Sequence, residues 1–193
     1  MASRKVFVLT ALCFLTLALS GAGSAQDHGT SATWLSRLNQ ELPLLGHRNW
    51  IAVVDSAYPL QTSDGIETIE TDGDQMDVVK KVLSKVAKAP HVRPVIFTDA
   101  ELKAVPESDA PGVSVYRNEL THFLEESAVV TGEVQSLPHE QIISRLDEAG
   151  KTFHILVLKT RMTIPYTSVF IRLDCGYWTD EQEKRLREKM AAR

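Results

Sequence analysis

The sequence predicts an α/β protein, a three-layer sandwich in which helices cover a central, mostly parallel sheet. Two short runs, WIAVV at 50–54 and PVIFT at 94–98, are almost continuously apolar. Such runs are typical of strands that are covered on both faces. Amphipathic stretches separate the apolar runs, and an alternation of strands with helices favours an α/β sheet.

The first half of the chain predicts two helices and two strands. Apolar residues at helical spacing indicate a helix that ends near Pro43 and another over 77–88. Residues 61–75 carry Thr, Ser, Gly and several acids, so we expect a surface segment there. After the second strand we expect a helix over 99–105, and then a loop of Pro, Ser, Asp and Gly at 106–112.

The second half continues the alternation. Helical periodicity covers 116–126, and residues 128–131 are expected to form a strand. Pro138 suits the first turn of a helix, which Gly150 then ends. Two further apolar strands are expected at 153–158 and 167–173.

The N-terminus has the order of a secretory signal peptide. Arg4 and Lys5 precede an apolar core at 6–20, and small residues follow at 23–25, where we expect cleavage after Ala25. A membrane anchor is the weaker alternative, because a spanning helix needs roughly 20 apolar residues. The protein is therefore expected to be secreted or periplasmic, with no membrane contact after cleavage.

The C-terminal end of the chain predicts a further helix, which belongs to the last of four expected parts. Thr179 and Gln182 form a capping box that starts a mostly charged helix over 180–192. This helix is either a solvated tail or a partner-binding arm. The parts are a signal peptide (1–25), a flexible segment (26–31), the α/β domain (32–178) and a C-terminal helical extension (179–193).

Charge and cysteine content exclude some classes of protein. Cleavage removes two positive charges and no acid, so the formal net charge moves from −4 to −6. Nucleic-acid binding is not expected, because the chain has no stripe of Arg and Lys interleaved with aromatic residues. Cys13 leaves with the signal peptide and Cys175 alone remains, which predicts a buried structural thiol and no internal disulfide. The fold must then hold by its core or by self-association.

Two groups that can hold or move protons frame the first strand. Histidine is the side chain whose ordinary pKa suits proton transfer near neutrality, and His47 lies just before the strand. Asp55 follows the strand eight residues later, which corresponds to roughly 25 Å in an extended chain. The two residues can share a site only if the chain folds back or if two subunits meet. The alternative is that His47 is a turn histidine with no role in catalysis.

Other polar residues give weaker indications. His139 begins a helix, His154 is expected to lie in the core or an interface, and Tyr166 begins a strand. A metal site is not expected, because no H-x-x-x-H, H-E-x-x-H or Cys/His cluster is present. A serine hydrolase is equally disfavoured by the lack of a G-x-S-x-G elbow.

Four short segments in a fixed order resemble the D-ribose pyranase and L-fucose mutarotase family. They are LGHRN at 45–49, DSAYP at 55–59, HEQ at 139–141 and KTRMTIPYTS at 159–168. Each segment alone is weakly specific, and the ordered set is more so. The resemblance extends over residues 35–176.

The resemblance implies a compact α/β fold that assembles into rings with sites between neighbouring subunits. It implies that His47 is the acid/base residue, that Asp55 and His139 bind sugar hydroxyls, and that Tyr166 and Ser168 line the pocket. The implied ligand is a free monosaccharide, and no metal or organic cofactor is implied. Opening a cyclic hemiacetal needs one proton given to the ring oxygen and one taken from the anomeric hydroxyl, which suits a histidine.

The chain departs from the family pattern at several polar positions. Ser168 stands where the family has asparagine, Met162 where it has glutamate, and Ile143 where some members have lysine. Arg161 and Asn49 replace a glycine and an aspartate. Loss of hydroxyl-binding partners changes discrimination between substrates. A second hypothesis is therefore a non-catalytic exported relative that keeps the scaffold for sugar binding or assembly.

Overall fold

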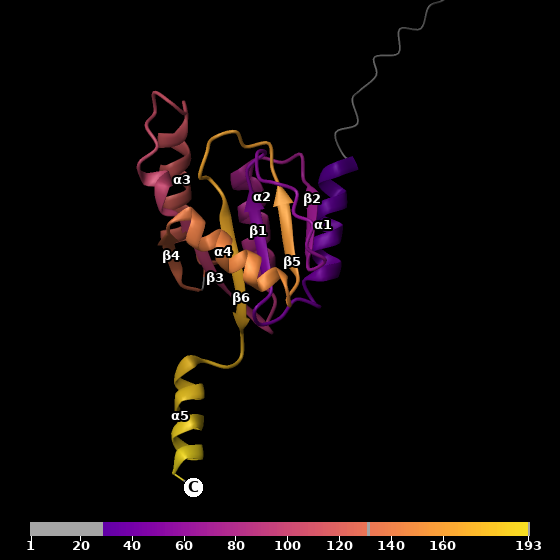
Figure 1. Ribbon diagram of the computed structural model, residues 1–193, viewed down its shortest axis with the longest axis vertical. Helices are drawn as coiled ribbons and strands as arrows, with labels where there is room; N and C mark the ends of the chain where they lie inside the picture. The colour runs from indigo at the N-terminus through magenta and orange to yellow at the C-terminus, as the bar shows by residue number, and fades with distance from the viewer. Residues whose placement is uncertain (1–28, 131, 193) are drawn as a thin grey trace, which may run out of the picture.

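The computed structural model describes residues 29–130 and 132–192 (Figure 1). The expected signal peptide lies outside the described residues, and the first described helix begins at Gly29, within the segment 26–31. In chain order the elements are α1 (Gly29–Glu41), β1 (Trp50–Val54), β2 (Ile66–Glu70), α2 (Gln75–Val86), β3 (Val92–Asp99), the 3-10 helix η1 (Ala100–Lys103), α3 (Val113–Glu126), β4 (Val134–Leu137), α4 (His139–Gly150), β5 (Ile155–Lys159), β6 (Val169–Cys175) and α5 (Asp180–Ala191).

One sheet contains all the described strands, in the order β2-β5-β1-β6-β3-β4. β1 and β2 both pair in parallel with β5, and β4 pairs in parallel with β3. β6 is antiparallel to both of its neighbours, β1 and β3. Of the described strands β6 alone is reversed, so the expected mostly parallel sheet is confirmed.

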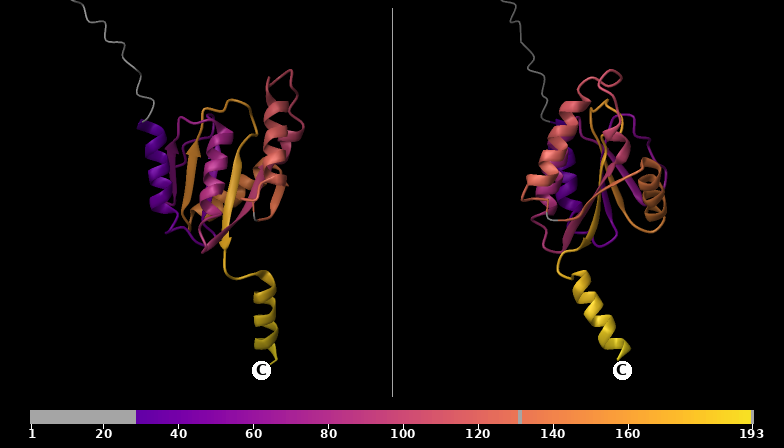
Figure 2. Two further views of the ribbon diagram at one scale, coloured as in Figure 1. Left: turned by 180° about the vertical axis from the view of Figure 1, so that it is seen from behind. Right: turned by 90° about the vertical axis from the view of Figure 1, so that its left-hand side faces the viewer.

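Helices cover both faces of the sheet, which confirms the three layers (Figure 2). α1, α2 and α3 pack on one face and α4 packs on the other. Side chains alternate along a strand. In β1, Ile51 and Val53 therefore face the first set of helices, whereas Trp50, Ala52 and Val54 face α4. All five residues of β1 are buried, which explains the uninterrupted apolar run.

The strand directions bring several loops to one edge of the sheet. The parallel strands end at the upper edge in Figure 1, where β6 begins. The loops that follow β1 and β3, the loop from β5 to β6, and the first turn of α4 all meet there. In α/β sheets, ligands bind in the crevice outside the carboxyl ends of the strands.

Three predicted elements differ from the structure, all at or near the sheet edges. The expected surface segment 61–75 contains the edge strand β2, whose sequence IETIE is only half-buried and so lacks a continuous apolar signal. Asp99 ends β3 and is followed by a 3-10 helix, not by an α-helix. Residues 128–130 are not a strand, and the edge strand is instead β4, which pairs Val134 with Ile96 of β3.

α5 projects from the rest of the molecule, below the sheet in Figure 1. It begins with the expected capping box, in which the Thr179 hydroxyl accepts from the Gln182 amide and the Gln182 side chain accepts from the Thr179 amide. None of its described residues is buried. Among the described residues, no helix is both long and apolar enough to cross a membrane.

Candidate functional site

A pocket of about 570 Å³ lies at the edge where the parallel strands end. Three segments build it: the loop after β1, the first turns of α4, and the loop from β5 to β6. Its volume is in the range of small-molecule sites, and its walls combine apolar side chains with a few polar groups. The lining residues are Asp55, Ser56, Ala57, Tyr58, Pro59, Gln61, His139, Glu140, Ile143, Thr163, Ile164, Pro165 and Tyr166.

Three of the residues singled out from the sequence line this pocket, namely Asp55, His139 and Tyr166. A fourth, Ser168, is buried behind it and donates from Oγ to Oδ2 of Asp55 at 3.3 Å. The backbone amide of Ala57 donates to Oδ1 of Asp55 at 2.9 Å. These two hydrogen bonds fix the carboxylate of Asp55 at the pocket. The fold thus brings Asp55 and His139 to one pocket, although they lie 84 residues apart in the sequence.

Asp99 holds the imidazole of His139. The Nδ1 atom of His139 lies 3.0 Å from Oδ1 of Asp99, whose side chain is fully buried. A carboxylate only accepts, so Nδ1 carries the proton and Nε2 is left for a ligand. Burial raises the pKa of Asp99 above its usual value, although the bond to His139 opposes that shift. Its second oxygen has no hydrogen-bond partner among the described residues.

Glu101 supports the same histidine from the backbone side. Pro138 precedes α4 and offers no side-chain cap to the first turn. The carboxylate of Glu101 accepts from the backbone amide of His139 with both oxygens at 3.0 Å. The short segment after β3 therefore fixes both the ring and the backbone of His139.

Tyr166 has a strained backbone. Its φ angle is +60°, a region in which a bulky side chain is an outlier. Such conformations cost about 1–3 kcal/mol and cluster at functional sites. Its ring meets the His139 ring edge-on, with centroids 5.7 Å apart. The turn thus places a half-exposed phenol beside the imidazole.

A buried polar network supports the loop from β5 to β6. The Gln75 side chain donates to the carbonyls of Val53 and Thr167 at 3.1 and 2.9 Å, and Thr160 donates to its oxygen. The Tyr116 hydroxyl also donates to the Thr167 carbonyl, at 2.6 Å. Satisfied buried networks rigidify a fold. This one holds the residue that follows Tyr166.

Tyr58 supplies a second phenol at the pocket. Burial, with a smaller contribution from nearby carboxylates such as Asp147, raises its pKa to about 12. The hydroxyl therefore keeps its proton at physiological pH, and it donates to Gln61 at 3.3 Å.

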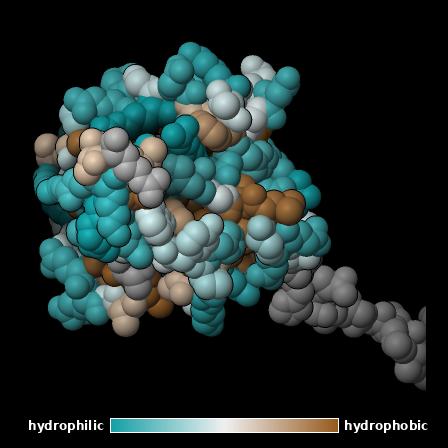
Figure 3. Space-filling view, turned by 90° about the horizontal axis from the view of Figure 1, so that it is seen from below, coloured by the Kyte–Doolittle hydropathy of each residue, from teal (hydrophilic) through white to brown (hydrophobic). Residues whose placement is uncertain are grey.

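His47 lies at the opposite end of the sheet from the pocket. It is more than half exposed, and its Nδ1 atom lies 2.7 Å from Oδ1 of Asp174 at the end of β6. β1 and β6 are antiparallel, so the start of one lies beside the end of the other. A single subunit therefore does not bring His47 to Asp55. Figure 3 views the molecule from this end, where the surface is mostly hydrophilic with a few apolar patches.

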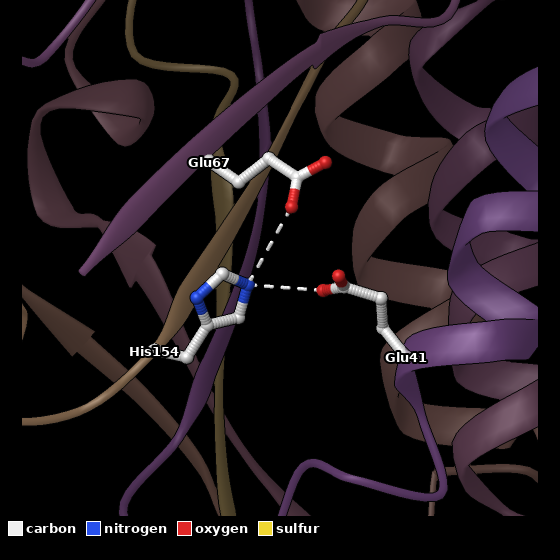
Figure 4. Close-up of side chains that lie close together, drawn as sticks. All are labelled: Glu41, Glu67 and His154. Atoms are coloured by element: carbon white, nitrogen blue, oxygen red, sulfur yellow. Dashed lines mark hydrogen bonds and ion pairs between the residues drawn. The ribbon is translucent and has the colours of Figure 1, made fainter. Parts of the chain in front are cut away.

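His154 belongs to an ion-pair cluster and is about one-third exposed, so it is not a core residue. Its Nε2 atom lies 2.9 Å from Glu41 and 3.9 Å from Glu67 (Figure 4). The ligand atoms of these three residues lie within 4.8 Å of one another. However, Arg37 already binds Glu67 through two nitrogens, at 2.9 and 2.7 Å, and Glu41 at 2.7 Å. A fixed guanidinium beside both carboxylates disfavours a divalent cation, so the cluster serves to join α1 to the edge of the sheet.

Three further residues singled out from the sequence have different surroundings. Ile143 lines the pocket and makes that wall apolar. Met162 is half-buried against the core on the α2 side. Cys175 is a free thiol that is only partly buried, which differs from the expected buried thiol.

Sequence reasoning missed Asp99 and Asp174, the two carboxylates that hold His139 and His47. A signal for Asp99 was present, because an acid directly follows an apolar strand at 94–98 just as Asp55 follows 50–54. Acids at the ends of parallel strands gather at one edge. Asp174 also follows an expected apolar strand, at 167–173, but β6 is antiparallel to β1 and β3, so its last residues lie at the opposite edge of the sheet.

No protein-family model and no curated protein sequence matches this sequence. Among solved structures, Bacillus subtilis RbsD complexed with D-ribose is 19% identical, with a TM-score of 0.49 over 72% of this chain and 92% of that one. The fucose mutarotase of Streptococcus pneumoniae in complex with L-fucose is 17% identical, with a TM-score of 0.42 over 75% and 93%. FucU from Bifidobacterium longum is 12% identical, with a TM-score of 0.49 over 72% and 92%. The likeness is one of fold. The chemistry of the site rests on the residues of this chain.

Proposed function

We propose that this protein is a monosaccharide mutarotase or pyranase-like isomerase, which interconverts the ring forms or anomers of a free sugar. The observation that carries the proposal is the convergence of Asp55, His139 and Tyr166 on one pocket, with Asp99 holding the imidazole. The carboxylate and imidazole offer hydrogen-bond partners for hydroxyls. The tyrosine ring and Ile143 offer an apolar wall for the C–H face of a sugar ring.

The reaction needs two proton transfers that cancel. A base takes the proton of the anomeric hydroxyl as the bond between the anomeric carbon and the ring oxygen breaks, and an acid protonates that ring oxygen. This gives the open-chain aldehyde. Rotation of the carbonyl and the reverse transfers close the ring on the other face and restore both groups. Positioned groups with a pKa near neutrality serve both steps.

A second copy of the chain supplies the missing histidine in this proposal. His47 and the pocket lie at opposite ends of the subunit, so the end of one copy that bears His47 would meet the pocket end of the next copy. Such a head-to-tail contact uses two different surfaces, and it closes into a ring when the rotation allows. His47 is exposed and so is free to reach a neighbour. We therefore propose a ring-type homo-oligomer, exported from the cytoplasm and acting without metal or cofactor.

Subunit complementation tests the shared site. Saturation-transfer NMR of anomeric exchange is measured for D-ribose, L-fucose and other free monosaccharides. We expect acceleration by the native protein, and little by either His47→Ala or His139→Ala. When the two variants are unfolded together and refolded at a 1:1 ratio, a head-to-tail ring recovers about a quarter of the native sites, because each site takes His47 from one copy and His139 from the next. No acceleration by native protein overturns the isomerase, and no recovery in the mixture overturns the shared site.

The second candidate is an exported sugar-binding or assembly protein without catalysis. The apolar side chain of Ile143 in the pocket favours it, because it offers no hydrogen bond to a hydroxyl. Thermal stabilisation by a sugar, without any acceleration of anomeric exchange, supports this alternative over the isomerase.

A further inference from the structure

The His47 end of the molecule contains a fixed carboxylate that no step of the proposed reaction has used. Oδ1 of Asp174 lies 2.7 Å from Nδ1 of His47 and accepts from the Cys175 backbone amide at 2.8 Å. Its other oxygen, Oδ2, accepts from Nη2 of Arg93 at 2.7 Å. Both oxygens are thus occupied, and the side chain is only 15% exposed.

We propose that Asp174 is a positioning residue for His47, which holds the neutral ring with its proton on Nδ1 and aims Nε2 away from the subunit. This inference rests on the proposed function, in which Nε2 of His47 exchanges a proton with a sugar bound to the next copy. A carboxylate can only accept, so the bond from Nδ1 decides which ring nitrogen carries the proton. The Nε2 lone pair is then the one available as a base.

The surroundings of Asp174 keep it an acceptor at neutral pH. Burial alone raises its pKa, but hydrogen bonds from Arg93, the Cys175 amide and His47 outweigh this and hold the pKa below its usual range. Arg93 also reaches Asp180 at the start of α5, at 3.4 Å. Arg93 on β3 and Asp180 on α5 are thus charged groups near Asp174, and of these three Asp174 is the one that contacts the ring.

His47 needs such a partner because its ring is otherwise loosely held. It sits in a turn, its side chain is 56% exposed, and the described residues offer the ring one hydrogen-bond partner, Asp174. A ring that rotates freely, or exchanges its proton between the two nitrogens, spends less time in the reactive geometry. Misplacement of a catalytic group costs up to about 100-fold in rate.

Two measurements test the inference independently. Nitrogen-15 NMR of the imidazoles, with His47→Ala to assign the signals, reports the tautomer in the native protein without any substrate. We expect the neutral His47 ring to carry its proton on Nδ1 in the native protein, and a mixture of tautomers in Asp174→Asn. In anomeric exchange we expect Asp174→Asn to lower kcat about 10- to 100-fold with little change in KM, because the sugar binds in the other copy.

Asp180→Asn is the matched control, since it removes a carboxylate that contacts Arg93 but not His47. It should leave both the tautomer and kcat at native values. A native His47 ring protonated on Nε2, or an Asp174→Asn variant with native tautomer and kcat, overturns the inference. If the native protein accelerates no sugar, the isomerase proposal falls, and the tautomer measurement still decides whether Asp174 orients His47.

Discussion

The Nδ1 atom of His139 lies 3.0 Å from Oδ1 of Asp99, a carboxylate that is fully buried at the end of β3. The bond joins an imidazole at the pocket to a carboxylate whose charged form is destabilised by burial. Burial raises the pKa of Asp99, so the folded protein binds this proton more tightly than the unfolded chain does. In the pH range just above the usual pKa of 3.8, the native fold therefore loses stability as the pH rises.

Replacement of Asp99 by asparagine should separate stability from activity. We expect Asp99→Asn to lower kcat for anomeric exchange about 10- to 100-fold, because His139 loses its fixed tautomer. The same variant should gain stability relative to the native protein as the pH rises from 4 to 7, since it carries no buried charge. Urea unfolding at the two pH values checks this. Asp64→Asn, at an exposed position, is the control. The prediction is contradicted if the native protein instead gains stability relative to Asp99→Asn as the pH rises.

The strained turn at Tyr166 predicts an unusual order of stability among variants at this position. Tyr166→Ala keeps the left-handed backbone and loses the ring, whereas Tyr166→Gly also relieves the strain. We expect the glycine variant to be more stable than the alanine variant by about 1 kcal/mol in urea unfolding, the reverse of the usual order. Both should bind sugar more weakly than Tyr166→Phe, which keeps the contact between the ring and His139. A more stable alanine variant would show that the turn is relaxed.

The ion pair between Arg37 and Glu67 predicts a pH-dependent effect on stability. The hydrogen bond from Arg37 holds the pKa of Glu67 below its usual 4.5. The pair therefore stabilises the fold above about pH 4.5, and this contribution is lost as the pH falls through the lowered pKa. Glu67→Gln should destabilise the protein by up to about 1 kcal/mol at pH 7 and by much less near pH 3.

Urea unfolding at pH 7 and pH 3 measures this effect. Glu70→Gln on the same strand is the control, because Glu70 is exposed at the end of β2. An equal loss at both pH values would assign the effect of Glu67→Gln to packing.

Because α5 is exposed, we expect the α/β domain to fold without it. None of its described residues is buried, and Asp180 in its first turn pairs with Arg93 of β3 at 3.4 Å. Ending the chain at Trp178 should change the free energy of unfolding by no more than about 0.5 kcal/mol. Sedimentation of the same variant separates the two expected roles of α5: an unchanged oligomer indicates a solvated tail, and a smaller one indicates a partner-binding arm. A loss of several kcal/mol would show that α5 packs on the domain.

The elements that the sequence predicted correctly depend on near neighbours in the chain. β1 was recognisable from its apolar run because both faces are covered, and α5 from the capping box of Thr179 and Gln182. β2 and β4 were missed for the converse reason. As half-exposed edge strands, their existence depends on pairing with β5 and β3.

The sequence likewise predicted one part of the candidate site and missed another. The sequence by itself indicated His47, Asp55, His139 and Tyr166, because local motifs mark them, and it indicated that the first two lie far apart along one strand. Only the tertiary structure paired His139 with Asp99, 40 residues away, and His47 with Asp174, 127 residues away. Those contacts depend on the order and direction of β1, β3 and β6 in the sheet. Strand order arises from the packing of the whole core, and the spacing of residues in a single segment does not encode it.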